Sequence, residues 1–291
     1  MKHLFFLILT VIMNVMLISS LVFADGETRK ATQKEKDFYK MVMETLIKAL
    51  PAGPEGWGEE KNQFTELEFV APGCEKYPFQ VFYGASWNDF TRKQVADDEI
   101  QKVLAPIMMS NASNPEYKKL IEQNDKLAKE FGEAAGKNDQ PAVERIQHEM
   151  ETNTKKIQIV LDANDKESDG IMKKLSARDV SIKVSMQVNE FSHGLEESVI
   201  QDAPVAGYLT YRSQGEWTKG NGWCEGTTYV FLGKGWQMKV DGGTSIETKE
   251  RNGITSTTVQ TIIVSVQADP ARAREVLEKI DWNLMKKLIQ N

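Results

Sequence analysis

The sequence is poor in the side chains that carry most covalent and metal chemistry. Its 291 residues include two cysteines and three histidines, which do not stand at the spacings of a zinc site. Phosphate-binding loops, dinucleotide fingerprints and Gly-x-Ser-x-Gly elbows are also missing. Adjacent carboxylates such as Asp97 and Asp98 occur, but spacing alone does not make them an acid–base pair. We therefore predict no cofactor, no metal and no catalytic residue.

Positive charge is in the minority. Lys and Arg number 36 against 42 Asp and Glu, so the net charge is −6 at pH 7. We see no basic stripe that interrupts this balance. Attraction to phosphate backbones drives nucleic-acid binding, so we expect no nucleic-acid partner.

The first residues read as a targeting segment. Residues 4–23 are almost wholly apolar, Val22 and Ala24 stand at the small-residue positions before a cleavage point, and Asp25 turns the chain polar. This pattern predicts a signal peptide, residues 1–24, and an exported protein, periplasmic or secreted. An uncleaved membrane anchor is the alternative, because about 20 apolar residues can span a bilayer.

The two cysteines, Cys74 and Cys224, favour one disulfide in an oxidising compartment. It would close a loop of about 150 residues and stabilise the fold by roughly 4–5 kcal/mol through lost unfolded-chain entropy. Two buried free thiols or one reactive thiol are the alternatives. A reactive thiol needs a neighbouring base, and His148 and His193 are the histidines that follow the signal peptide.

Two stretches in the middle of the chain repeat apolar residues at alternating spacings of three and four, with a break at residues 137–140. This is the pattern of helices that meet along a seam. Folding one stretch back on the other places Asn124 opposite Asn153 and predicts an antiparallel two-helix coiled-coil arm. A helix pair lying flat on the core is the alternative. The expected seam is Tyr117, Leu120, Asn124, Leu127, Phe131, Ala134, Val143, Ile146, Met150, Asn153, Ile157 and Val160.

The flanking stretches predict an α+β body, an antiparallel sheet of about six or seven strands with a helix near each end packed on it. Residues 179–191 alternate plainly as one strand. Residues 224–232 and 236–240 are expected to form a hairpin. The apolar run Ile262, Ile263 and Val264 predicts an interior strand covered on both faces.

The chain therefore divides into four parts. Residues 1–24 are the signal peptide, 25–109 the first half of the body, 110–178 the inserted arm, and 179–291 the second half of the body.

Residues 165–170 resemble the start of a calcium-binding loop, because Asp165, Glu167 and Asp169 alternate before Gly170. The pattern then fails, since Ser176 stands where a bidentate Glu is needed. The favoured alternative is a charged, solvated break where the arm rejoins the body.

Aromatic side chains gather in a Gly-rich region near the C-terminal third of the chain. They could stack on a glycan or a lipid headgroup, or they could fill the core. The candidate ligand face comprises Trp217, Trp223, Tyr229 and Trp236.

Residues 50–57, Leu-Pro-Ala-Gly-Pro-Glu-Gly-Trp, resemble a motif of uncharacterised exported bacterial proteins. Residues 266–269 and 280–282 are similar in the same way. The order helix, sheet, helix is also similar to PsbP-like modules. The resemblance implies a periplasmic or secreted protein of unknown function and transfers no catalytic residue.

These observations favour an exported, non-enzymatic binding or scaffold protein. Its arm would contact a protein partner or a second copy of the chain, and membrane contact would follow if the signal segment is uncleaved. The alternative is a ligand-binding domain or an enzyme with its site on the aromatic face.

Overall fold

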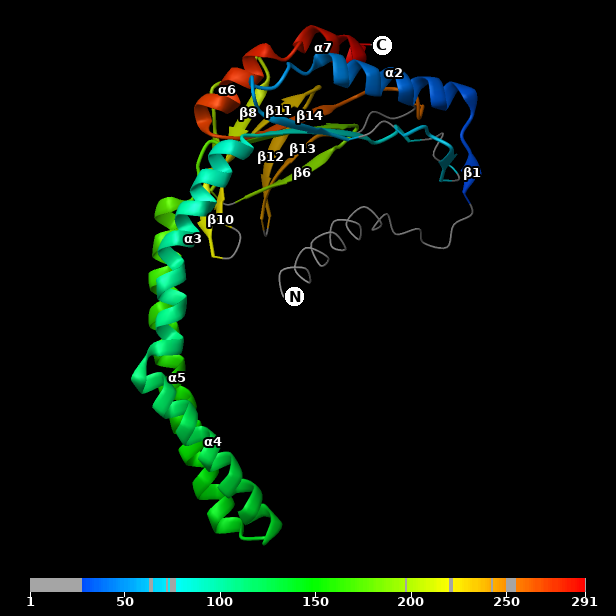
Figure 1. Ribbon diagram of the computed structural model, residues 1–291. Coiled ribbons are helices and arrows are strands. Elements are labelled where there is room, and N and C mark those ends of the chain that lie inside the picture. Colours follow the sequence, from blue (N-terminus) through cyan, green and yellow to red (C-terminus); the bar gives the residue numbers. More distant parts are fainter. Residues whose placement is uncertain are drawn as a thin grey trace.

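The computed structural model describes residues 28–62, 65–71, 73, 77–196, 198–219, 222–241, 243–249 and 255–290, with the backbone alone at 108–113 and 290 (Figure 1). The fold is α+β, as the sequence predicts. A sheeted body carries helices on one face and a long helical arm at one end. The expected signal peptide and Cys74 lie outside the described residues.

The main sheet has seven antiparallel strands in the order β2-β4-β5-β14-β11-β8-β7. The central strand β14 contains Ile262, Ile263 and Val264, all fully buried, so the expectation of an interior strand covered on both faces is confirmed. The strands are β2 (Gly58–Lys61), β4 (Val81–Asn88), β5 (Ser181–Val188), β7 (Ile200–Gln201), β8 (Leu209–Arg212), β11 (Thr227–Leu232) and β14 (Ile262–Gln267).

Helices α2 (Gln33–Ala49), α6 (Pro270–Lys279) and α7 (Trp282–Gln290) cover one face of this sheet (Figure 1). Their apolar stripes bury residues such as Leu46 and Met285 against side chains of β4, β5 and β14. This is the main hydrophobic core. The predicted packing of a helix near each end of the body is confirmed.

A second sheet of three strands, β12 (Gln237–Val240), β13 (Thr244–Glu247) and β6 (Ser192–Leu195), forms a smaller core with the other face. The expected hairpin of residues 224–232 and 236–240 is wrong, because β11 pairs with β14 and β8 while β12 pairs with β13. Gly233 and Gly235 have φ of 116° and 79°, which other residues adopt at a cost. They turn the chain from one sheet into the other.

Asn189 makes the second crossing between the sheets. Residues 179–191 were expected to form one strand, but β5 ends at Val188 and Asn189 takes a left-handed φ of 60°. Its fully buried side chain donates to the carbonyls of Phe79 (2.7 Å) and Thr258 (2.9 Å) and accepts from the amide of Gln260 (2.8 Å). One amide therefore joins three segments of the chain at this corner.

Two short strand pairs complete the body. Strand β1 (Arg29–Lys30) pairs with β3 (Phe69–Val70), and β9 (Glu216–Thr218) pairs with β10 (Gly222–Cys224). The second pair lies at the foot of the arm, where its side chains contact α5.

The arm consists of α3 (Phe90–Ser113), α4 (Pro115–Gly136) and α5 (Gln140–Leu175) (Figure 1). The sequence predicts that α3 belongs to the body, but α3 packs along α5 and forms the part of the outgoing limb nearest the body. The expected break at residues 165–170 is also wrong. Helix α5 runs unbroken for 36 residues, about 54 Å at 1.5 Å per residue.

Candidate functional site: the helical arm and its mount

Helices α4 and α5 meet along the twelve seam positions anticipated from the heptad spacing. All twelve are buried or half-buried, and the other side chains of α4 are exposed. At the tip, Asn138 takes a φ of 55° and the Asp139 side chain accepts from the amide of Ala142 to begin α5. Asn114 caps α4 by accepting from two amides, with Pro115 in the first turn. The hairpin thus buries one narrow stripe and exposes the rest.

The seam contains a polar layer whose hydrogen bonding is incomplete. Asn124 and Asn153 are both half-buried. The Asn124 Oδ1 atom is buried and accepts no hydrogen bond from any described residue. A buried acceptor without a donor costs about 1–3 kcal/mol, so this layer weakens the hairpin. Polar residues in a seam are used to select register and partner at such a cost.

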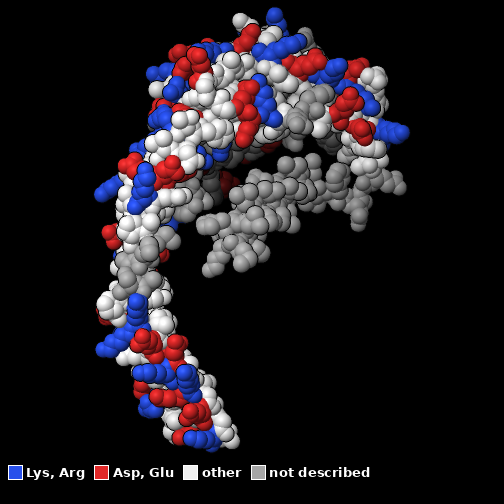
Figure 2. Space-filling view, in the orientation of Figure 1, with Lys and Arg blue, Asp and Glu red and all other residues white. Residues whose placement is uncertain are grey.

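The outer surface of the distal arm is mixed in charge. Figure 2 shows acidic and basic side chains interspersed over its length. One hollow of about 620 Å³ opens beside the seam, where Phe131 and Met150 are half-exposed. Its rim carries Glu151 and Lys155. The hollow is apolar at its floor and charged at its edge, as helix-binding grooves are.

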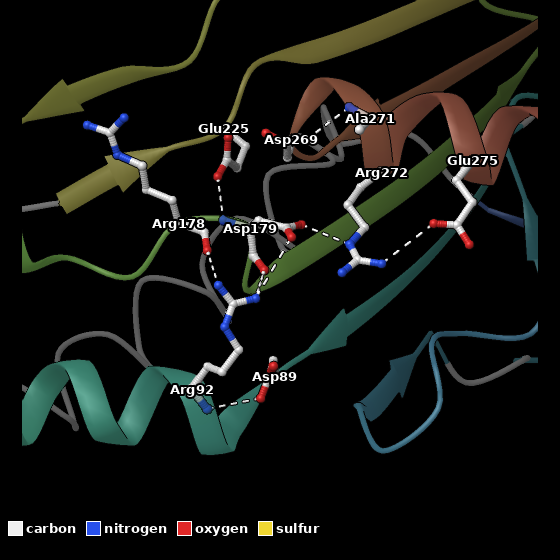
Figure 3. Close-up of polar contacts among 9 residues, drawn as sticks. All are labelled: Asp89, Arg92, Arg178, Asp179, Glu225, Asp269, Ala271, Arg272 and Glu275. Carbon is white, nitrogen blue, oxygen red and sulfur yellow. Dashed lines mark hydrogen bonds and ion pairs between the residues drawn. The ribbon is translucent and has the colours of Figure 1, made fainter.

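The foot of the arm is tied to the body through Asp179, which follows α5 and has a φ of 52° (Figure 3). Arg92, in the first turn of α3, donates to the carbonyls of Asp179 (3.0 Å) and Arg178 (3.2 Å). Its guanidinium also lies 3.8 Å from Asp179 Oδ2. The start of the outgoing limb is thereby joined to the end of the returning limb.

The same aspartate reaches two elements of the body. Arg272 of α6 donates from Nε to Asp179 Oδ1 at 2.9 Å, and this bond raises the pKa of the Arg272 guanidinium. The amide of Asp179 donates to Glu225 Oε1 at 2.9 Å. Charge-assisted bonds of this kind are short and directional. We refer to Arg92, Asp179, Glu225 and Arg272 as the mount.

Farther along the arm, the β9–β10 hairpin braces α5. Trp217 Nε1 donates to Asp169 Oδ1 (3.2 Å), and Lys219 Nζ lies 3.4 Å from Asp165 Oδ2. These carboxylates stand four residues apart on one helix face, while Glu167, two residues from each, points elsewhere. The calcium-loop interpretation is therefore wrong, because the residues lie within a helix. Across the part of the chain that the structure describes, no cluster of potential metal ligands is present.

The four aromatic residues of the candidate ligand face do not form one surface. Trp217 and Trp223 are cross-strand partners in the β9–β10 hairpin at the arm's foot. Tyr229 and Trp236 pack on the smaller core, where the Trp236 ring lies 5.1 Å from that of Phe231. The two pairs serve different elements, so the proposed common face is absent from the described structure.

Cys224 ends strand β10, is half-buried and forms no disulfide with a described residue. Its expected disulfide partner, Cys74, lies outside the described residues. The bridge therefore stays a prediction.

The sequence does not predict the mount, because its contacts join residues far apart in the chain. Arg92, Asp179 and Arg272 are charged residues that belong to no local pattern. The hydrogen bond between Arg272 and Asp179 joins residues 93 positions apart in the sequence. The one local sign is Asp89, which caps α3 by accepting from the amide of Arg92 at 3.0 Å. That signal marks a helix start and says nothing about its partners.

No protein-family model, curated protein or solved structure matches this chain. Among the described residues, the helices are all too short or too polar to cross a bilayer. The fold and the site together define an α+β body that carries a braced helical arm.

Proposed function

We propose that the chain is an exported, non-enzymatic binding or scaffold protein whose arm contacts a protein partner or a second copy of the chain. The main support for this proposal is that the distal arm projects away from the body (Figure 1) and buries apolar side chains only along its own seam. The body has a separate core that includes no residue of α4. Ordering a projection of this length costs conformational entropy and adds nothing to that core.

The contacts at the foot of the arm favour an arm held in a fixed orientation over one attached by a flexible linker. The mount joins both limbs to α6 and to the loop before β11, and the brace holds α5 farther out. A flexibly linked arm would need neither the mount nor the contacts of the β9–β10 pair with α5. The hollow beside Phe131 and Met150, with its apolar floor and charged rim, is suited to receive another helix.

The decisive variant shortens both limbs together. Residues 122–155 are replaced by a short Gly/Ser turn, so that Ile121 and Lys156 remain opposite each other in the expected register. The body should keep its thermal unfolding transition, because its core is intact. Partners recovered from the envelope or secreted fraction, and any self-association measured by sedimentation, should be lost. Retention of the same partners and the same oligomeric state would exclude the arm as the interaction element.

A point substitution tests the hollow. Ala128→Trp fills it, and Ala135→Trp is the matched control, because Ala135 is exposed on the same helix but does not line the hollow. A photo-crosslinking side chain at Gln147 should capture one defined product, which Ala128→Trp abolishes and Ala135→Trp preserves. Equal yields from both variants would place the contact elsewhere on the arm.

A further inference from the structure

A cavity of about 980 Å³ lies at the foot of the arm, beside the mount. Its wall is assembled from distant segments, namely Arg178 after α5, residues 202–206, the end of β8, the β10 hairpin and the start of α6. Cavities of roughly 300–1,000 Å³ accept small organic molecules. This cavity is distinct from the distal arm and from its hollow.

Three arginines line the cavity, and none forms an ion pair with a described carboxylate. Arg212 donates to the carbonyl of Ala268 at 2.9 Å and to the hydroxyl of Thr228. The Arg178 guanidinium lies 4.1 Å from the ring centre of Trp223 and points away from the mount (Figure 3). Arg274 is exposed on α6. Each guanidinium therefore keeps N–H donors for another molecule.

Arg212 and Arg274 lie close enough for their charges to interact. Burial lowers the pKa of the Arg212 guanidinium, and the positive charge of Arg274 lowers it further. The charges of Asp202, Asp269 and Glu225 oppose this lowering, but none of these carboxylates forms an ion pair with the Arg212 guanidinium, and a half-buried guanidinium without a direct ionic partner is electrostatically costly. A bound anion would offset the desolvation of Arg212 and its repulsion from Arg274.

Three carboxylates along the same wall each accept a hydrogen bond from a backbone amide. Asp202 accepts from the amide of Ala203 (2.7 Å), Glu225 from that of Asp179 (2.9 Å), and Asp269 from that of Ala271 (2.9 Å). Their charges oppose the lowering of the Arg212 pKa but do not pair with its guanidinium. Glu278 is exposed at the rim. Four carboxylates therefore share the wall with the three arginines, and none of them forms an ion pair with these arginines.

The remaining lining is apolar and partly aromatic. Trp223 and Trp282 face the cavity together with Val205 and Leu277. Trp223 is held in place by close packing on Gly215, where a Cβ atom would lie 2.8 Å from its ring. Such rings cover the apolar part of a ligand well.

We propose that this cavity binds a small organic anion, a carboxylate or phosphate group carried on an apolar body. The guanidiniums of Arg178, Arg212 and Arg274 hold the anionic group, because planar N–H forks match carboxylate and phosphate oxygens. The apolar body packs on Trp223 and Trp282. This site goes beyond the proposed role of the arm and does not depend on it.

Calorimetric titration of the full chain with four probes tests the ligand class. Octanoate and octyl phosphate combine both features, 1-octanol lacks the charge, and inorganic phosphate lacks the apolar body. At least one of the first two should saturate at one site and bind at least tenfold more tightly than 1-octanol and inorganic phosphate. The same titration should change tryptophan fluorescence. Failure of both amphiphilic anions to saturate, or equal binding of 1-octanol, overturns the proposal.

Variants locate the site. Arg178→Gln and Arg274→Gln alter exposed side chains that make no described hydrogen bond through their guanidiniums, so the body should keep its unfolding transition. Together they should weaken the preferred probe at least tenfold. Arg145→Gln, on the distal arm, is the matched control and should leave binding unchanged. If the double variant binds as tightly as this control, the arginine assignment is wrong. If it unfolds, either single variant still decides the question.

Discussion

Asp179 and Arg272 stand 93 positions apart and form a hydrogen-bonded ion pair of 2.9 Å between the end of the arm and the C-terminal part of the body. Both side chains are about 30% exposed, at 29% and 32%. Arg92 adds the start of the arm to the same aspartate. The orientation of the arm therefore rests on directional charge-assisted bonds at its foot as well as on packing.

Asp179→Asn should loosen the arm without unfolding the body. Asn tolerates the left-handed φ of this position but removes the charge that Arg272 and Arg92 share. We expect a loss of about 1–2 kcal/mol, because the pair is partly solvated. Hydrogen exchange should accelerate in residues 90–95 and 172–181. Glu275→Gln, which removes an exposed partner of Arg272, is the control, and equal acceleration in both variants would contradict the mount.

The brace predicts a measurable coupling between Trp217 and Asp169. Trp217→Phe keeps an aromatic ring and removes the indole N–H, and Asp169→Asn removes the accepting charge. A double-mutant cycle on thermal unfolding of the arm should give about 0.5–1.5 kcal/mol of coupling. The pair Trp217 and Glu167 should show none. Additive losses at Trp217 and Asp169 would mean that their contact does not support α5.

Asn124→Leu should stabilise the arm. The substitution removes a buried Oδ1 without a donor and adds apolar surface to the seam, for a gain of about 1 kcal/mol or more. Circular dichroism should show later helix loss on heating. Gln123→Leu, one residue away and exposed, should leave the transition unchanged. The oligomeric state of both variants should be measured by light scattering, because a polar residue in the seam can also select the number of chains that associate.

Asn189→Ala should destabilise the body by about 3–5 kcal/mol, since it leaves two carbonyls and one amide without their partner in a buried corner. Denaturant unfolding measures the loss. Asn189→Asp should be nearly as damaging, because a carboxylate would face the carbonyls of Phe79 and Thr258. A mild effect from the Asp variant would show that the amide donors contribute little.

Glu35 predicts acid sensitivity at the N-terminal helix. The Arg29 guanidinium donates at 2.7 and 2.9 Å and, with Thr32, lowers the pKa of the Glu35 carboxyl from 4.5 to about 2 despite burial. A carboxylate whose pKa is lower in the folded state than in the unfolded state stabilises the fold, and this stabilisation is complete above the unfolded-state pKa. The contribution of Glu35 should therefore disappear as the pH falls from about 4.5 to about 2.

At pH 7, Glu35→Gln should therefore cost about 2–3 kcal/mol in the free energy of unfolding, with the difference from the native chain shrinking below pH 4.5. Glu44→Gln, exposed on the same helix, is the control. A difference that stays constant from pH 7 to pH 2 would show that ionisation of Glu35 is not its cause.

The seam of the arm could be predicted because it is local. Heptad spacing states which face of α4 and α5 is buried, and the break at residues 137–140 states where the chain reverses. The caps at Asn114 and Asp139 follow from the same short-range chemistry. The alternation of β5 and the apolar run in β14 were readable for the same reason.

The errors share one cause. Residues 165–170 carry turn-like composition, yet contacts with α3 and the β9–β10 hairpin keep α5 helical there. The expected hairpin after Cys224 failed because periodicity identifies strands without naming their partners. The four aromatics looked like one cluster along the chain, but Tyr229 and Trp236 serve the smaller core while Trp217 supports the arm.

The sequence by itself determined the α+β class, the two faces of the central strand and the buried stripe of the arm. Each follows from residue spacing that repeats over a few turns or strand positions. Tertiary structure alone decided that α3 belongs to the arm, that two sheets share the body, and that Asp179 joins both limbs to α6. Those features depend on residues that meet from far apart in the chain, and the side chain of one residue does not specify which distant residue it will contact.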